Sequence, residues 1–178
     1  MSALATLTQL SPLSPKALSR ALRTGTTDAL KRRRGVLSLS LTAAGSMGLI
    51  ALYQMGVIKH LPDPPLPYFD ADKVDASPQA YAYFSAPDGA LGLASYAATA
   101  VLAVAGGPDR ARSTPWLPLL AAAKTGIDAA TAAKLTADQW TEHRAFCGWC
   151  LLAAGATFAA VPLALPEARD ALRSLRKG

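Results

Sequence analysis

The sequence has only two cysteines and two histidines among its 178 residues. So few cysteines exclude the disulfide scaffold of small secreted proteins, and no second cysteine or histidine pair completes a zinc site, so we expect no metal. A glycine-rich phosphate loop is also missing: Gly106 and Gly107 stand at the end of an apolar run, without the strand and helix that such loops need. These absences argue against a nucleotide or metal enzyme.

The N-terminal region lacks an uninterrupted apolar core. Prolines at positions 12 and 15 break residues 1–27, so this stretch does not have the usual form of a signal peptide. Leucines and basic residues are spaced in a weakly amphipathic pattern (Leu18, Leu22 and Leu30 beside Lys16, Arg20 and Arg23). The pattern predicts either a surface helix lying against anionic headgroups or a partly disordered tail.

Aromatic residues are few, at 7%, while hydrophobic residues make up 51% of the chain. Alanine, leucine and glycine dominate that fraction, which suits helices packed closely in lipid. The net charge of +6 could suggest nucleic acid. Most basic residues, however, lie just outside the apolar runs rather than along a stripe interleaved with aromatics, so we expect no nucleic-acid partner.

Four apolar runs are present, at residues 36–58, 90–105, 115–133 and 146–165. The first would be about 34 Å long as a helix, enough to cross a hydrocarbon core of about 30 Å. We expect the fourth to end at Pro166. The chain is therefore predicted to be all-α, an integral membrane four-helix bundle with an outer loop or lid between the first two helices.

The third run carries two charges, Lys124 and Asp128, four residues apart and so on one helix face. It is either a soluble amphipathic helix or a span whose charged pair points into the bundle. The order lysine then aspartate is the weaker one for such a pair, which favours separate partners on neighbouring helices.

Basic residues predict the topology. The connections on the side of both termini hold 13 lysines and arginines, against 4 on the other side, so both termini should face the cytoplasm. We expect a bacterial inner-membrane protein with a basic segment (residues 1–34), a four-span membrane domain (35–172) and a basic tail (173–178).

The long connection at residues 59–87 is rich in proline and acidic residues, so its start should be extended and irregular. It also holds a group of aromatic residues (Tyr68, Phe69, Tyr81, Tyr83 and Phe84). Such a group beside a membrane forms an interfacial belt, or it closes a cavity at the mouth of the bundle.

Both cysteines lie in the string Phe146-Cys147-Gly148-Trp149-Cys150, at the start of the fourth run. Residues three apart in a helix are neighbours, within the distance that a disulfide allows. At a helix N-terminus, the free N–H groups and the dipole favour a thiolate. The pair is either a redox-active dithiol, facing lipid-soluble quinone, or two small buried hydrophobic residues.

Residues near the cysteines have alternative interpretations. His143 shares a helix face with Cys147 if the helix starts early, and Arg144 is nearer still. A cation beside a thiol favours the thiolate, and a neutral imidazole could take the thiol proton; otherwise His143 is an ordinary surface histidine. Trp149 either anchors the chain at the interface or forms a wall of a quinone pocket.

The four spans, the CxxC that opens the last one and the long loop between the first two resemble the vitamin K epoxide reductase family over residues 35–172. The specific matches are Phe146 to Cys150, the helix end at 165–167 and Gly92-Leu93-Ala94-Ser95-Tyr96 in the second run. The resemblance implies a membrane thiol oxidoreductase that passes electrons between a CxxC and a quinone or its epoxide.

The resemblance also implies roles for single residues. Cys150, the deeper sulfur, would react with the quinone, and Cys147, the more accessible one, would exchange with a thioredoxin-like or other thiol protein. Asp88 falls where vertebrate members carry an asparagine that binds the quinone carbonyl, although Asp88 also suits the N-cap of the second helix. The remaining predicted quinone contacts are Phe146, Trp149, Ser95 and Tyr96, and the quinone would be menaquinone, ubiquinone or phylloquinone.

Two departures from the family bear on function. Residues 59–87 lack the second cysteine pair that the family uses as a relay, so the CxxC must exchange directly with a separate thiol protein or reductant. Ala154 also replaces a tyrosine of vertebrate members. Three interpretations stay open. The chain is an oxidase of secreted proteins, a reductase of quinone or its epoxide that takes its electrons from a small thiol, or a non-catalytic four-span structural or assembly subunit.

Overall fold

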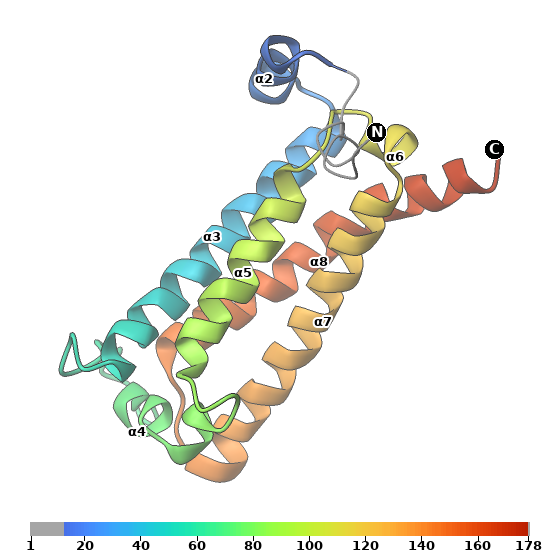
Figure 1. The fold of residues 1–178 in the computed structure, drawn as a ribbon. Coiled ribbons are helices and arrows are strands. Elements are labelled where there is room, and N and C mark those ends of the chain that lie inside the picture. The colour runs from blue at the N-terminus through green and yellow to red at the C-terminus, as the bar shows by residue number, and fades with distance from the viewer. Residues whose placement is uncertain (1–12, 178) are drawn as a thin grey trace.

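The computed structural model describes residues 13–177, whose regular elements are helices apart from one isolated bridge between Phe69 and Phe146. The four long helices lie side by side (Figure 1) and are α3 (Asp28–Gln54), α5 (Asp88–Val104), α7 (Trp116–Asp138) and α8 (Gly148–Leu175). Helix α3 packs against α5 and α8, and α7 packs against α8. The all-helical prediction is confirmed, and each predicted apolar run corresponds to one long helix.

Short helices occupy the ends of this bundle. Helices α2 (Pro15–Thr24) and α6 (Arg110–Ser113) lie at the end near the C-terminus of α8 (Figure 1). Helix α4 (Ala71–Asp75) lies at the opposite end, and two single turns, η1 (Pro78–Tyr81) and η2 (Gln139–His143), complete the order.

The first long helix starts earlier than the apolar run predicted. The Thr27 hydroxyl accepts a hydrogen bond of 3.3 Å from the N–H of Leu30 and so caps α3. The basic cluster at 31–34 is therefore helical. At the other end, Gly56 takes a positive φ of 74°, which ends the helix before the predicted residue 58.

The predicted bounds of the fourth helix are wrong at both ends. Helix α8 begins at Gly148, not at Phe146, and continues through Pro162 and Pro166 to Leu175. Each proline removes one backbone donor from the helix. Contacts beyond Pro166 hold the helix together, since Ala168 and Ala171 are buried there.

Of the two alternatives for the N-terminal region, the structure has the surface helix, and only the inclusion of Leu30 in it is wrong. Helix α2 has no buried residues and ends at Thr24, whereas Leu30 is 3% exposed and belongs to α3. Residues 1–12 of the predicted basic segment lie outside the described residues.

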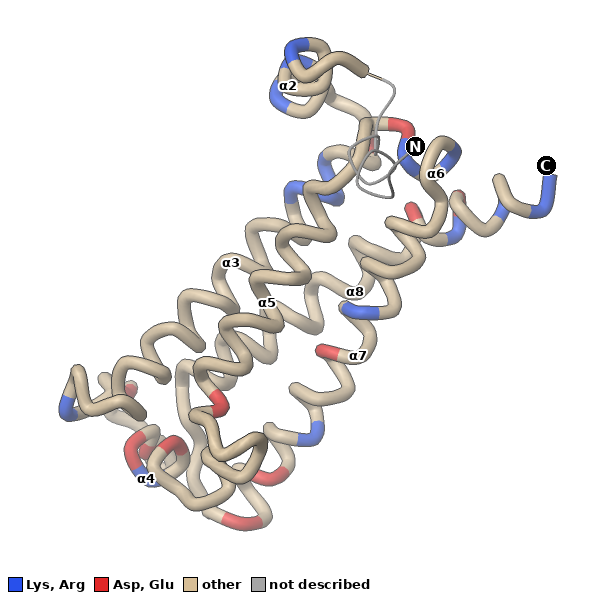
Figure 2. Tube along the Cα trace, viewed as in Figure 1, with Lys and Arg blue, Asp and Glu red and all other residues tan. Residues whose placement is uncertain are grey.

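Two helices, α3 and α8, are long and apolar enough to cross a membrane, and α5 is apolar but shorter. Basic residues gather at the end with α2 and α6, and acidic residues gather around α4 (Figure 2). We call these the basic end and the acidic end of the bundle.

The charged pair of α7 faces the bundle. The Lys124 ammonium lies 2.6 Å from Asp128 Oδ1 and 2.8 Å from the Ser95 hydroxyl of α5, and Asp128 also accepts a bond of 2.8 Å from Thr99. The prediction that the pair points inward is confirmed. The inference that the two charges take separate partners is wrong, because the α5 hydroxyls join the ion pair instead of replacing it.

Two arginines organise the basic end. Arg33, which is 5% exposed, donates to the carbonyls of Ala103 and Gly107 at 2.9 Å each, at the C-terminus of α5. Arg110, which is 1% exposed, binds both carboxylate oxygens of Glu167, at 2.9 and 2.7 Å. Each of these three charged head groups therefore has partners.

Candidate functional site

The connection between α3 and α5, residues 55–87, folds over the N-terminus of α8, and we call it the cap segment. The N–H of Asp70 donates to the carbonyl of Phe146 at 3.0 Å, and the N–H of Phe146 donates to the carbonyl of Tyr68 at 2.7 Å. The Trp149 indole donates to the carbonyl of Pro62 at 2.9 Å. The cap segment thus covers the start of α8, as the predicted lid would.

Acidic side chains hold the cap segment in shape. Asp70 caps α4 by accepting from the N–H of Lys73 at 2.9 Å. Asp72 accepts from the N–H of Leu61 at 2.9 Å and pairs with His60 at 2.7 Å. Asp63 accepts from the N–H of Ala71 and, at 3.4 Å, from that of Gly148, which ties the cap to α8. The start of the connection, residues 59–67, contains no helix or strand, as predicted, and the acidic side chains hold this irregular stretch in a defined conformation.

Cys147 lies beneath the cap segment. It is the N-cap of α8, and its Sγ accepts a bond of 3.2 Å from the N–H of Cys150. Cys147 is 0% exposed and lies in a core cluster with Leu61, Ala71 and Val74 of the cap segment. The prediction that Cys147 is the more accessible sulfur is wrong, because Cys150 is partly exposed whereas the cap segment covers Cys147.

A carboxylate from the cap segment faces both thiols. The Cys150 thiol donates to Asp75 Oδ1 at 3.4 Å, and a carboxylate oxygen of Asp75 and the two sulfurs all lie within 4.8 Å of one another. Asp75 is 2% exposed, and its Oδ2 has no hydrogen-bond partner among the described residues. Both sulfurs are free thiols at a separation from which a small movement would join them.

Burial raises the pKa of Asp75 to about 6. The neighbouring thiols oppose this shift, and the charges of Asp88 and Asp63 add to it. Among the described residues these two sulfurs and one carboxylate are grouped alone, one short of the four ligands that zinc usually takes. The expectation of no metal therefore stays a prediction.

Sequence reasoning missed Asp75. Its only signal was membership of the acidic stretch of residues 63–75, where the aspartates look equivalent. The fold of α4 selects Asp75 from them and turns it toward the sulfurs.

The predicted cationic neighbours of the thiols lie elsewhere. His143 ends η2, and the left-handed residue Arg144 (φ 51°) separates it from α8, so His143 does not share a helix face with Cys147. The guanidinium of Arg144 lies 5.5 Å from the centre of the Trp140 ring. The early helix start that would place His143 on the face of Cys147 is therefore wrong, and an effect of Arg144 on the thiol stays a prediction.

Asp88 is the first residue of α5, not its N-cap, which is Pro87. Its Oδ1 accepts a bond of 2.7 Å from Gln54 Nε2, and the same nitrogen donates to the backbone carbonyl of Asp75 at 3.1 Å. The N-cap interpretation is therefore wrong. Gln54, which sequence reasoning also missed, links Asp88 to the residue that contacts the thiols.

Phe146 belongs to an aromatic cluster beside the thiols. Its ring stacks on Trp140 at a centroid distance of 5.6 Å, and Tyr68 meets Trp140 edge-on at 5.6 Å. Phe84, by contrast, is 90% exposed. Some aromatic residues of the cap segment thus join this cluster and others face outward, and both the interfacial belt and the cavity lid stay predictions.

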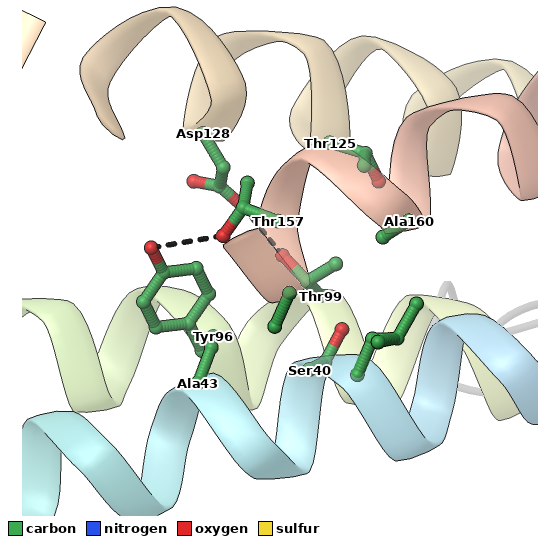
Figure 3. A pocket seen from close by; sticks show the side chains of 10 residues that line it. Ser40, Ala43, Tyr96, Thr99, Thr125, Asp128, Thr157 and Ala160 are labelled. Carbon is green, nitrogen blue, oxygen red and sulfur yellow. Dashed lines mark hydrogen bonds between the residues drawn. The ribbon is translucent and has the colours of Figure 1, made fainter. Parts of the chain in front are cut away.

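Ser95 and Tyr96 lie deeper in the bundle. The Tyr96 hydroxyl accepts a bond of 3.1 Å from Thr157, beside a cavity of about 10 Å³ that Asp128 also lines (Figure 3). That space suits about one water molecule. Tyr96 also packs against a cluster of three alanines, Ala43, Ala153 and Ala156, whereas Ser95 binds the Lys124–Asp128 pair. The five predicted quinone contacts are therefore divided between two levels of the bundle.

A model of the vitamin K epoxide reductase family matches residues 35–165. No curated protein and no solved structure matches the chain. Members of this family are membrane-embedded oxidoreductases that use quinone and exchange electrons with thiols. The match covers most of the sequence and includes α5, the cap segment and both cysteines, so the chain belongs to the vitamin K epoxide reductase family.

Proposed function

We propose that the chain is a quinone-linked thiol–disulfide oxidoreductase whose reactive groups are Cys147 and Cys150. The observation that supports this most is the placement of both thiols within 4.8 Å of each other at the N-terminus of α8. Closing the pair into a disulfide releases two electrons and two protons, which convert a quinone to a quinol. The opposite direction uses the same groups.

The proposed membrane arrangement is a bundle of four spans. The lengths and hydropathy of α3 and α8 support two of them, and the apolar α5 supports a third. In α7 the Lys124 ammonium and Asp128 carboxylate neutralise each other against α5 hydroxyls, which makes a charged pair tolerable within a bundle. The basic end would face the cytoplasm, with residues 13–34 and 173–177 lying on that side.

In this arrangement the thiols lie at the non-cytoplasmic end, where disulfide exchange is useful in a bacterium. We propose that the quinone ring binds beside Cys150, which is the less buried of the two cysteine residues. Phe146 and Trp149 adjoin the two cysteines in the chain, and Asp88 begins α5, so we propose these three residues as the quinone contacts there. Tyr96, which packs against the alanine cluster that includes Ala153 of α8, would line the deeper part of that site.

The thiol partner would react at Cys147, and the burial of this sulfur sets a condition on that step. Leu61, Ala71 and Val74 of the cap segment cover it, so a protein thiol reaches it only when the cap segment moves. A thioredoxin-like carrier is the expected partner, because the chain has no loop cysteines to relay electrons.

A second candidate function is a structural membrane subunit in which the cysteines only pack. The complete burial of Cys147 favours it, since buried cysteines often behave as small hydrophobic residues. The buried carboxylate beside the thiols argues against it, because an apolar residue would pack there without the desolvation penalty.

The experiment uses the full chain in membranes, reduced and then exposed to ubiquinone-1 or menadione. Thiol labelling follows closure of the pair over time. We expect closure that depends on quinone, with Cys147→Ser and Cys150→Ser variants leaving one thiol permanently labelled. A pair that stays reduced with quinone would contradict the proposal.

A comparison of two oxidants separates quinone binding from thiol reactivity. Trp149→Ala should slow closure by quinone by about tenfold or more, while closure by diamide, a small chemical oxidant that needs no quinone site, should stay within about twofold of wild type. Equal slowing with both oxidants would mean that the variant has disturbed the thiols and not a quinone site.

A further inference from the structure

Asp75 is a buried carboxylate at the acidic end whose charge has no structural partner. Among the described residues no lysine, arginine or histidine forms an ion pair with it. Its Oδ1 accepts from the Cys150 thiol, and its Oδ2 accepts nothing in the described part of the chain. Because burying an unpaired carboxylate is unfavourable, its presence needs a reason other than packing.

The surroundings of Asp75 determine which proton it can take. Both thiols of α8 face it, Asp88 and Asp63 approach from α5 and the cap segment, and Tyr53 faces it from α3. The thiols are the only proton donors in this set that must lose a proton during the reaction. No ion pair among the described residues places a cation on this carboxylate.

We propose that Asp75 is a catalytic residue that accepts the proton of the Cys150 thiol when the pair is oxidised and returns it when the pair is reduced. This rests on the proposed function. In the oxidising direction the Cys150 S–H bond breaks, an O–H bond forms on Asp75, and the sulfurs bond to each other. The quinone takes two electrons, one proton by way of Asp75 and one from Cys147, and leaves as quinol.

Burial prepares Asp75 for this role. Its pKa of about 6 makes the carboxylate the main form at neutral pH and yet brings it close to the operating pH, where a general base is most effective. The hydrogen bond of 3.4 Å from Cys150 Sγ to Oδ1 already lies along the path of the proton.

The test compares Asp75→Asn, Asp75→Glu and a control, Asp70→Asn, in the full chain. Asp70 caps α4 in the same segment, and asparagine caps a helix as well as aspartate does. We measure the rate of quinone-dependent closure between about pH 4.5 and about pH 8.5, a range that spans the titration of a general base near neutrality. In the wild type the rate should rise through about pH 6 and then level off, following ionisation of the carboxylate.

In Asp75→Asn the closure rate should show no plateau and should rise steadily with pH. At about pH 6.5 closure should be about 100-fold slower than in the wild type. Asp75→Glu should restore a plateau, and Asp70→Asn should keep the wild-type profile. If Asp75→Asn closes as fast as wild type at that pH, or faster, the carboxylate only repels a thiolate and the proposal is overturned.

A second measurement does not need quinone. In a Cys147→Ser background, alkylation of Cys150 by iodoacetamide should show the same plateau when Asp75 is present and the same steady rise when the Asp75→Asn change is added. If quinone never closes the pair but alkylation depends on Asp75 in this way, the proposed function fails while the proton transfer stands. An alkylation profile that the Asp75→Asn change leaves unaltered overturns the proton transfer itself.

Discussion

Both ends of the bundle bury charged groups, but an arginine and a glutamate pair at the basic end, whereas the buried Asp75 at the acidic end has no ion-pair partner among the described residues. At the basic end, Arg110 and Glu167 hold each other by two hydrogen bonds, and Arg33 caps the carbonyls at the C-terminus of α5. At the acidic end, Asp75 is as well buried, but it has a thiol for a partner and one oxygen with none among the described residues.

This difference separates a structural network from a reactive site. Satisfied buried charges stabilise one arrangement of helices, because removing any member leaves another without a partner. An unsatisfied buried carboxylate destabilises the folded chain while it is charged and is ready to take a proton. Its position over Cys147 and Cys150 therefore fits chemistry rather than architecture.

Breaking the basic-end network should give the largest loss of stability. Arg110→Ala leaves Glu167 buried without its cation, for which we expect a loss of about 3–5 kcal/mol in the free energy of unfolding. Thermal unfolding in detergent measures it. The Arg110→Met, Glu167→Met double variant should recover most of that loss, because it removes both charges. Recovery of none would mean that the pair does more than neutralise itself.

The acidic end should show a stability that depends on pH. The pKa of Asp75 is about 6 in the folded chain against an ordinary value of 3.8, so the folded state binds its proton more tightly. Proton binding by Asp75 therefore adds to the free energy of unfolding in full below pH 3.8, and this stabilisation is lost as the pH rises through 6. The loss is about 3 kcal/mol for a shift of about two units.

Asp75→Asn should remove that pH dependence and make the chain more stable than wild type at neutral pH. Unfolding at a series of pH values from about 3.5 to about 7.5 checks this, since the range covers both the folded and the ordinary pKa. Asp70→Asn is the control, and its free energy of unfolding should depend on pH as that of the wild type does. An Asp75→Asn chain that loses stability at neutral pH would show that the carboxylate is a structural partner after all.

The Lys124–Asp128 pair tests whether an ion pair in the middle of the bundle stabilises the fold as the Arg110–Glu167 pair does at the basic end. Lys124→Met removes the ammonium but leaves Asp128 with the Ser95 and Thr99 hydroxyls, so the expected loss is smaller, about 2 kcal/mol. The Lys124→Met, Asp128→Asn double variant should lose less than the single one. The rate of quinone-dependent thiol closure should not change in either variant; a slower rate would place this pair in the reaction.

The smallest effect should come from loosening the cap segment. Trp149→Phe keeps an aromatic ring but loses the hydrogen bond to the carbonyl of Pro62, which is worth about 1 kcal/mol. Local opening of the cap segment should become about fivefold more frequent. The frequency of opening is measured as the rate of alkylation of Cys147 in a Cys150→Ser background. The Phe146→Leu variant is measured alongside for comparison. An unchanged rate would mean that opening does not pass through this contact.

The sequence predicted the helices well and their contacts less well. Apolar runs locate α3, α5, α7 and α8, since hydrophobicity is a local property. The end of α8 was misjudged at Pro166, because the burial of Ala168 and Ala171 against other helices outweighs a missing hydrogen bond and cannot be read locally. The start of α3 was predicted too late, because one capping threonine outside the apolar run, Thr27, sets it.

The candidate site was predicted only in part. The CxxC string gives the two thiols and their helix N-terminus directly. Asp75 comes to the site from a position 75 residues before Cys150, and Gln54 from still further away, so only the fold of the cap segment selects them. The cover over Cys147 is likewise tertiary, which is why position in the helix gave the wrong order of accessibility.

The reduction potential of the Cys147–Cys150 pair tests the contrast between the two ends most directly. The full chain in membranes would be equilibrated with dithiothreitol buffers of defined potential, and the fraction of free thiol would be read by labelling. A redox site at the acidic end predicts a potential above about −300 mV, within reach of thiol carriers. A potential below about −300 mV, or a pair that never closes, would mean that this end is as structural as the other.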